Sequence, residues 1–202
     1  MSHLSHRSGY AEFVDRLNRF PQGAPESPTL FKILKILLNE REAGLIAQLP
    51  IRPFAVDQAA KIWKMSVKEA SRILEDLAGR ALLVDIEVEG QTTYVLPPPM
   101  AGFFEFSMMR TRGDIDQHAL GELFYQYMNV EEDFIRALFV DGETQLGRVF
   151  VQEPMLDESG GVHVLDYERA SEVIRSASYR GISMCYCRHK MQHVGRNCDA
   201  PM

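Results

Sequence analysis

The sequence predicts an α+β protein that is mostly helical, with a winged-helix-like domain and a second small helical and β segment ending in a cysteine loop. Helical spacing of apolar residues recurs along most of the chain. Two apolar segments of alternating pattern flank Glu89-Gly90, which is typical of a β-hairpin. The expected divisions are an N-terminal helix and linker at 1–25, the winged-helix-like domain at 26–99, a helical and β segment at 100–181, and a cysteine-containing segment at 182–202.

Composition is that of an ordinary globular protein, with 46% hydrophobic and 25% charged residues. No apolar run approaches the roughly 20 residues that span a bilayer, so membrane insertion is not expected. The formal net charge of −6 argues against non-specific affinity for nucleic acid. Reduced thiols and the lack of a secretory pattern at the N-terminus predict a cytoplasmic location.

Three helices are expected before residue 50. The first is marked by apolar residues at i, i+3, i+4 and i+7, namely Tyr10, Phe13, Val14 and Leu17. A proline-containing linker at 21–25 follows it. Ser27 is a good N-cap for a strongly apolar helix that runs through Leu38. Asn39 with Glu42 resembles a capping box and predicts a third helix.

Residues 52–96 have the order helix, turn, helix, β-hairpin, which is the winged-helix pattern. The first helix is expected at 56–63, and the second begins after Ser66 as a capping box. The strands are expected at 82–88 and 91–96. The second helix would carry its apolar face on Val67, Ala70, Ile73, Leu74 and Leu77.

DNA binding by this domain is the main alternative function, and the charges weigh against it. The exposed charges of the second helix nearly cancel, being Lys68, Glu69, Arg72, Glu75 and Asp76. The hairpin adds three acids that would face phosphates, Asp85, Glu87 and Glu89. A role in structure or protein docking is therefore preferred. Three cations keep DNA binding open, above all if a homodimer presents them twice: Lys61, Lys64 and Arg80.

Residues 100–181 are expected to add buried and helical segments. Gly102–Met109 is aromatic and methionine-rich, and we expect it to be buried. Asp114 with Gln117 predicts the start of a helix that forms a hairpin with a second one at 131–139. Strands are expected at 147–153 and 162–165. A helix capped by Asp166 would then lead to the cysteines, with an inner face of Ala170, Val173, Ile174 and Ala177.

All three cysteines fall in one segment, at Cys185, Cys187 and Cys198. If the chain between them folds back, three thiolates can converge on one soft metal centre. A zinc-type site that also uses His189 or His193 remains an alternative. A disulfide is the weaker interpretation, because three thiols cannot all pair and a bridge between Cys185 and Cys187 would close a very small ring.

Cys-x-Cys-Arg, a basic histidine-containing stretch and Cys-x-x-Pro together resemble the first cluster segment of a family of 4Fe-4S ferredoxin-domain proteins. In that family a winged-helix-like region precedes the cysteines, and a looser likeness covers Gly102–Phe106. The resemblance implies that Cys185, Cys187 and Cys198 are cluster ligands. It also implies a fourth cysteine a few residues beyond Pro201, so the sequence is expected to be a piece of a longer chain.

The function expected from this resemblance is 4Fe-4S binding for electron transfer, with a redox partner protein. Three basic residues would lower the thiol pKa values and offset the charge of the cluster: Arg188, His189 and Lys190. No catalytic constellation is present, since His163, Asp157 and Glu158 fit a strand and a solvated loop. Enzymatic activity of this piece alone is not expected, although it could serve an oxidoreductase as an electron-transfer component. The alternative is a winged-helix transcriptional regulator that senses redox state or metal.

Overall fold

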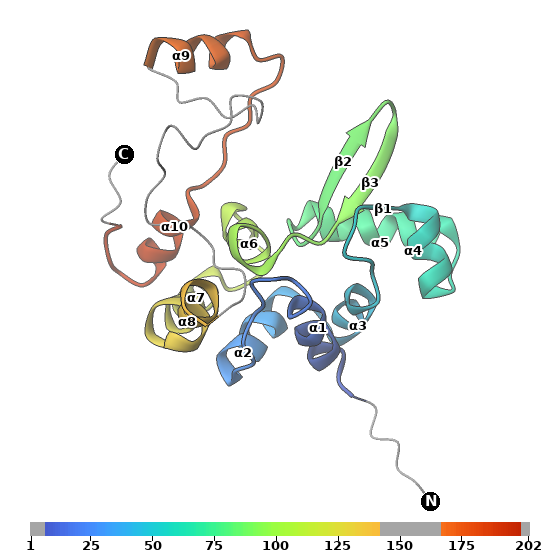
Figure 1. The fold of residues 1–202 in the computed structure, drawn as a ribbon, viewed down its shortest axis with the longest axis horizontal. Helices are drawn as coiled ribbons and strands as arrows, with labels where there is room; N and C mark the ends of the chain where they lie inside the picture. The colour runs from blue at the N-terminus through green and yellow to red at the C-terminus, as the bar shows by residue number, and fades with distance from the viewer. Residues whose placement is uncertain (1–6, 142–166, 199–202) are drawn as a thin grey trace, which may run out of the picture. The chain divides into compact units, whose positions relative to one another are not determined.

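The computed structural model describes residues 7–141 and 167–198 (Figure 1). The chain divides into two units, one made of Met1–Gln145 with Met184–Met202 and the other of Leu146–Ser183. The described residues are mostly helical and include a three-stranded antiparallel sheet, so the α+β class is confirmed. None of the helices in these residues has the length and apolar character needed to cross a membrane.

The three predicted N-terminal helices are present as α1 (Gly9–Leu17), α2 (Pro28–Leu37) and α3 (Glu40–Ala47). Side chains cap each of them as the sequence predicted for the second and third. Ser27 Oγ accepts a hydrogen bond from the Leu30 amide, and Asn39 with Glu42 forms a complete capping box. The buried apolar faces of these helices make one core, with Phe13, Leu17, Leu30, Ile33, Leu34 and Ile46 wholly inaccessible.

The order helix, turn, helix, hairpin is also present, as α4 (Val56–Trp63), α5 (Val67–Gly79), β2 (Val84–Val88) and β3 (Gln91–Val95). Glu89 and Gly90 both have positive φ, at 53° and 77°, which is the conformation of a two-residue turn that matches the strand twist. A two-residue strand, β1 (Phe54–Ala55), pairs with β3 and completes the sheet in the order β1-β3-β2. The sequence did not reveal β1, because two residues cannot show an alternating pattern.

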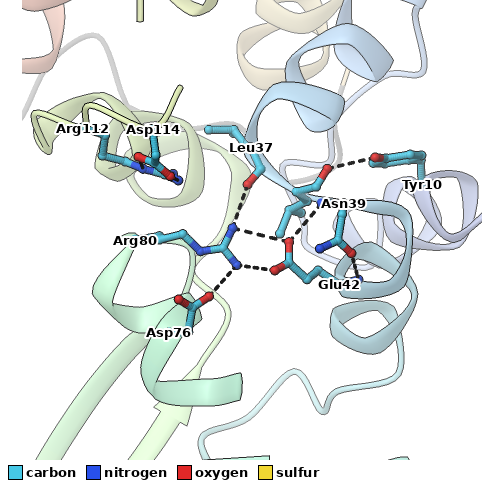
Figure 2. Close-up of polar contacts among 9 residues, drawn as sticks. Tyr10, Leu37, Asn39, Glu42, Asp76, Arg80, Arg112 and Asp114 are labelled. Atoms are coloured by element: carbon cyan, nitrogen blue, oxygen red, sulfur yellow. Dashed lines mark hydrogen bonds and ion pairs between the residues drawn. The ribbon is translucent and has the colours of Figure 1, made fainter. Parts of the chain in front are cut away.

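Arg80, which follows α5, joins the N-terminal helices to the helix-turn-helix segment (Figure 2). Its guanidinium lies 2.6 Å from Glu42 Oε1 and 2.9 Å from Asp76 Oδ2, and it donates to the Leu37 carbonyl at 3.3 Å. The side chains of Arg80 and Glu42 are only 19% and 20% exposed. Leu37 is the last residue of α2 and Glu42 is in the first turn of α3, so one cation binds parts of three helices.

The segment after the prolines supplies the aromatic centre of the larger unit. It comprises the π-turn η1 (Pro99–Phe103) and α6 (Phe104–Met109), and Phe103, Phe104 and Met108 are wholly buried, as predicted. The Phe104 ring packs edge-on against four others, those of Phe103, Phe124, Tyr127 and Phe134, at centroid distances of 5.5–5.8 Å. These rings come from α6, α7 (Gln117–Tyr125), η2 (Gln126–Val130) and α8 (Glu132–Phe139), with Phe103 from η1.

The expected helix pair after residue 110 is present, but its predicted cap is wrong. Asp116, not Asp114, accepts a hydrogen bond from the Ala119 amide at the start of α7. Asp114 instead receives two hydrogen bonds from Arg112, which also hold the pKa of Asp114 below its usual range. An arginine two residues away therefore competes successfully with the helix N-terminus for this carboxylate.

In the smaller unit, only α9 (Tyr167–Ser176) and the residues up to Ser183 are described. The predicted inner face of this helix is wrong for the described residues, because Val173 and Ile174 are 57% and 61% exposed and no residue of α9 is buried. An amphipathic pattern predicts that a helix has an apolar face, but it does not show whether another element packs against that face. The strands expected at 147–153 and 162–165, the Asp166 cap and His163 lie outside the described residues.

Replacing Arg80 with Ala is expected to lower the free energy of unfolding by about 2 kcal/mol, because charged hydrogen bonds to Glu42 and the Leu37 carbonyl are lost together. The matched control is Arg41→Ala, which removes an ion pair with Glu69 whose side chains are 72% and 42% exposed. That change should cost less than about 1 kcal/mol. Denaturant unfolding measures both, and equal losses would show that the Arg80 contacts do not join the helices.

Candidate metal centre

The cysteine segment is built around a helix, α10 (Tyr186–His193), so the prediction of a cysteine loop is wrong in this respect. Cys185 is the N-cap residue, and its carbonyl accepts a hydrogen bond from the His189 amide at 2.9 Å. Cys187 lies in the first turn, while Cys198 follows the helix. Two of the three predicted ligands are therefore at the N-terminal end of α10.

The helix ends in a Schellman motif. Gly195 has φ +67°, and its amide donates to the Gln192 carbonyl at 3.2 Å. The Arg196 amide donates back to the Met191 carbonyl at 2.9 Å. The left-handed glycine reverses the chain after the helix and carries it toward Cys198.

Packing against other helices of the same unit stabilises this short helix, whose N-cap makes no side-chain hydrogen bond. His189 and Lys190 are both buried. His189 Nδ1 lies 2.7 Å from the carbonyl oxygen of Met108 at the end of α6, and Lys190 Nζ donates to Asn129 Oδ1 in η2 at 2.6 Å. Two residues expected to form a basic loop near the metal thus serve as the polar contacts that dock α10.

Aromatic side chains surround the Lys190 ammonium. It lies 5.3 Å from the ring centroid of Tyr186 and 5.9 Å from that of Tyr125, within the range of cation–π attraction. Burial lowers the pKa of Lys190, while the negative potential of Cys187, Cys198 and Glu105 opposes this. Burial also raises the pKa of Tyr186, whose hydroxyl lies 2.9 Å from Met128 Sδ.

Gly121 sets the distance between α10 and α7. A Cβ atom at this glycine would lie 2.8 Å from His193 Cβ and 3.5 Å from the Lys190 carbonyl. Any larger residue would therefore push the two helices apart. A glycine inside a predicted helix can indicate that another element packs closely against that helix. Gly121 was the one sequence signal for the packing of α10 on α7.

The thiols themselves differ in environment. Cys185 and Cys187 are exposed, and Cys198 is half-buried. Burial raises the pKa of the Cys187 thiol, Lys190 lowers it, and negative charge on Cys185, Cys198 and Glu105 raises it further. The expectation that nearby basic residues lower the thiol pKa values is wrong for Cys187, because its partial burial raises the pKa by more than Lys190 lowers it.

No three histidine, cysteine or acidic side chains within 7–141 and 167–198 are placed so that they could hold one metal ion. The three thiols nevertheless share one neighbourhood, because Cys185 and Cys198 both act on the pKa of Cys187. The donors are soft thiolates, which suit iron–sulfur clusters or zinc, but they are three where a 4Fe-4S cluster commonly takes four. The set therefore fits a cluster in chemical type and lacks one ligand.

Comparisons with known proteins add no constraint. No protein-family model matches this chain, and searches of curated proteins and of solved structures likewise found no match.

Substituting Gly121 with Ala should destabilise the protein by about 1 kcal/mol or more, since the new methyl group meets His193 Cβ rather than a flexible chain end. This would reverse the gain of about 1 kcal/mol that Ala normally brings to a helix interior. Gly113→Ala is the control, because a Cβ there meets nothing within 4 Å. A stabilised Gly121→Ala protein in denaturant unfolding would contradict the docking of α10 at this site.

Proposed function

We propose that this chain binds a 4Fe-4S cluster through Cys185, Cys187 and Cys198 and takes part in electron transfer with a redox partner protein. The observation that carries the proposal is the placement of the chain's three cysteines beside one helix that is docked on the core. Cys185 and Cys187 are exposed, so an inorganic cluster has access to both thiols.

The N-terminal end of α10 suits a negatively charged cluster. The first amide groups of an α-helix lack carbonyl partners within the helix, and its dipole places positive potential at this end. Cys185 and Cys187 lie at that end of α10. A thiolate-ligated cluster there would receive amide hydrogen bonds, which stabilise negative charge on its sulfur atoms.

The electrostatics of the thiols also favour a cation. Cys185 and Cys198 each raise the pKa of Cys187 when they carry negative charge, as does Glu105. Three thiolates in this neighbourhood therefore repel one another unless metal ions neutralise them. A bound metal reverses this balance, because a coordinating thiol loses its proton outright.

A fourth ligand has to come from outside the cysteines of this chain, either from residues not included in these 202 or from a non-cysteine side chain. A zinc ion bound by the same three thiols and a histidine is the second candidate. His189 is a poor fourth ligand as placed, because its Nδ1 is engaged with the Met108 carbonyl and the side chain is buried.

Residues 54–95 are proposed to form a winged-helix-like domain with a structural or docking role, on the strength of the order α4, α5, β2, β3 with β1 at the sheet edge. DNA binding remains the alternative, and its support is reduced. Of the three cations that favoured it, Arg80 is held by Glu42 and Asp76, whereas the side chain of Lys61 stays 81% exposed.

Anaerobic reconstitution with iron and sulfide tests the proposal. The Cys185→Ser/Cys187→Ser double variant is expected to lose one cluster's worth of iron and sulfide, because two thiolate ligands are gone. Gln192→Ser, an exposed position on the same helix, is the control and should retain both. Equal iron and sulfide in the double variant and the wild type would refute the assignment, and stoichiometric zinc without sulfide would favour the zinc site.

A further inference from the structure

Strand β2 forms one edge of the three-stranded sheet, since among the described strands it pairs with β3 alone (Figure 1). Every residue of β2 from Asp85 to Val88 is exposed, and the apolar side chains of Ile86 and Val88 are 42% and 61% exposed. An edge strand presents a row of backbone N–H and C=O groups with which another extended chain can pair. The free edge of β2 is therefore a candidate site for an added strand.

The turn of the hairpin determines which backbone groups of β2 face outward. Val88 lies opposite Gln91, and Glu89-Gly90 joins them as a two-residue turn. The pair that flanks such a turn exchanges both of its hydrogen bonds, and pairs with and without hydrogen bonds then alternate along the antiparallel ladder. The N–H and C=O groups of Asp85 and Glu87 therefore face away from β3, where no other strand of the described residues pairs with them.

The side chains of β2 alternate between an acidic and an apolar face. Asp85 and Glu87 lie on one face, and Ile86 and Val88 lie on the other. The carboxylates thus belong to the same two residues whose backbone groups face outward. A strand that pairs with this edge would place one set of its side chains opposite two negative charges and the other set beside exposed apolar side chains.

A second copy of this chain is a poor partner for the edge. Antiparallel pairing through the outward groups would place Asp85 or Glu87 of one copy opposite Asp85 or Glu87 of the other, and like charges directly opposite destabilise a sheet. The net charge of −6 adds to the repulsion between two copies. Opposite charges at the same positions stabilise the pairing, so the two acids favour a basic strand.

We propose that the edge of β2 binds an extended basic segment of a partner protein as an added antiparallel strand. In this segment lysine or arginine alternates with apolar residues, so that its cations lie opposite Asp85 and Glu87 and its apolar side chains lie beside Ile86 and Val88. Backbone hydrogen bonds supply affinity in this mode of recognition, and alternate side chains supply specificity. The inference rests on the docking role proposed for residues 54–95 and states the chemistry of the partner.

The test uses the full chain and a fluorescent peptide of about seven residues that alternates lysine with valine. Fluorescence anisotropy is expected to show saturable binding of one peptide per chain. Asp85→Asn/Glu87→Gln should weaken binding about fivefold, because two cross-strand ion pairs are lost. The matched control is Glu132→Gln/Asp133→Asn, which removes the same two charges from exposed positions in the first turn of α8 and should leave the affinity unchanged.

Methylation of the peptide backbone separates strand addition from simple attraction between charges. In the proposed pairing the lysine amides donate to β2, whereas the valine amides point away from it. A peptide methylated on its lysine amides should therefore fail to bind, because these donors are gone. The peptide methylated on its valine amides has the same charge and composition and should still bind.

Three results would each overturn the added strand: no saturable binding, equal affinities for the two methylated peptides, or equal losses in the two double variants. A chain that sediments as a dimer and becomes monomeric with Ile86→Glu would assign the edge to a second copy and overturn the proposal as well. Circular dichroism establishes that each variant is folded. The assay involves neither iron nor sulfide, so its failure is separate from failure of the cluster proposal.

Discussion

The docking of α10 on α6 and α7 is the constraint on which the proposed cluster site depends. One hydrogen bond ties His189 to the last turn of α6, and Gly121 lets the two helices approach closely. Without this contact α10 would be a helix of eight residues with no side-chain cap, far too short to persist alone in water. Moving α10 would leave buried polar groups without hydrogen-bond partners, which costs free energy. The docked position of α10 is therefore specific.

Two cations that the sequence offered for external partners are instead held by contacts inside the larger unit. Arg80 connects Glu42, Asp76 and the Leu37 carbonyl, while Lys190 connects Asn129 with two aromatic rings. From the sequence alone, Arg80 was a candidate to bind a DNA phosphate and Lys190 was a candidate to lie near the cluster. Once such a cation is desolvated and paired, moving it outward leaves its partners unsatisfied.

Local signals in the sequence predicted the elements better than the contacts among them. The capping box at Asn39, the Glu89-Gly90 turn and the burial of Phe104 depend on neighbours along the chain or on strong apolar content, and all are confirmed. The Asp114 cap failed because Arg112 competes for that carboxylate. Helix α10 was missed because tertiary packing, which no local pattern reports, forms it. The sequence showed that the three cysteines lie in one segment. It could not show that His189 is buried, because its partner is the carbonyl of Met108, a backbone group far away in sequence.

The central claim is that the core holds the cysteine segment in place before any metal arrives. Hydrogen exchange of the backbone amides in α10, measured on the chain after chelators have removed metal, tests it directly. The account predicts that the later amides of α10, from His189 to His193, exchange far more slowly than an unstructured peptide, because they are hydrogen-bonded in a docked helix. Exchange at the rate of an unstructured chain, with protection appearing only after metal is added, would contradict it.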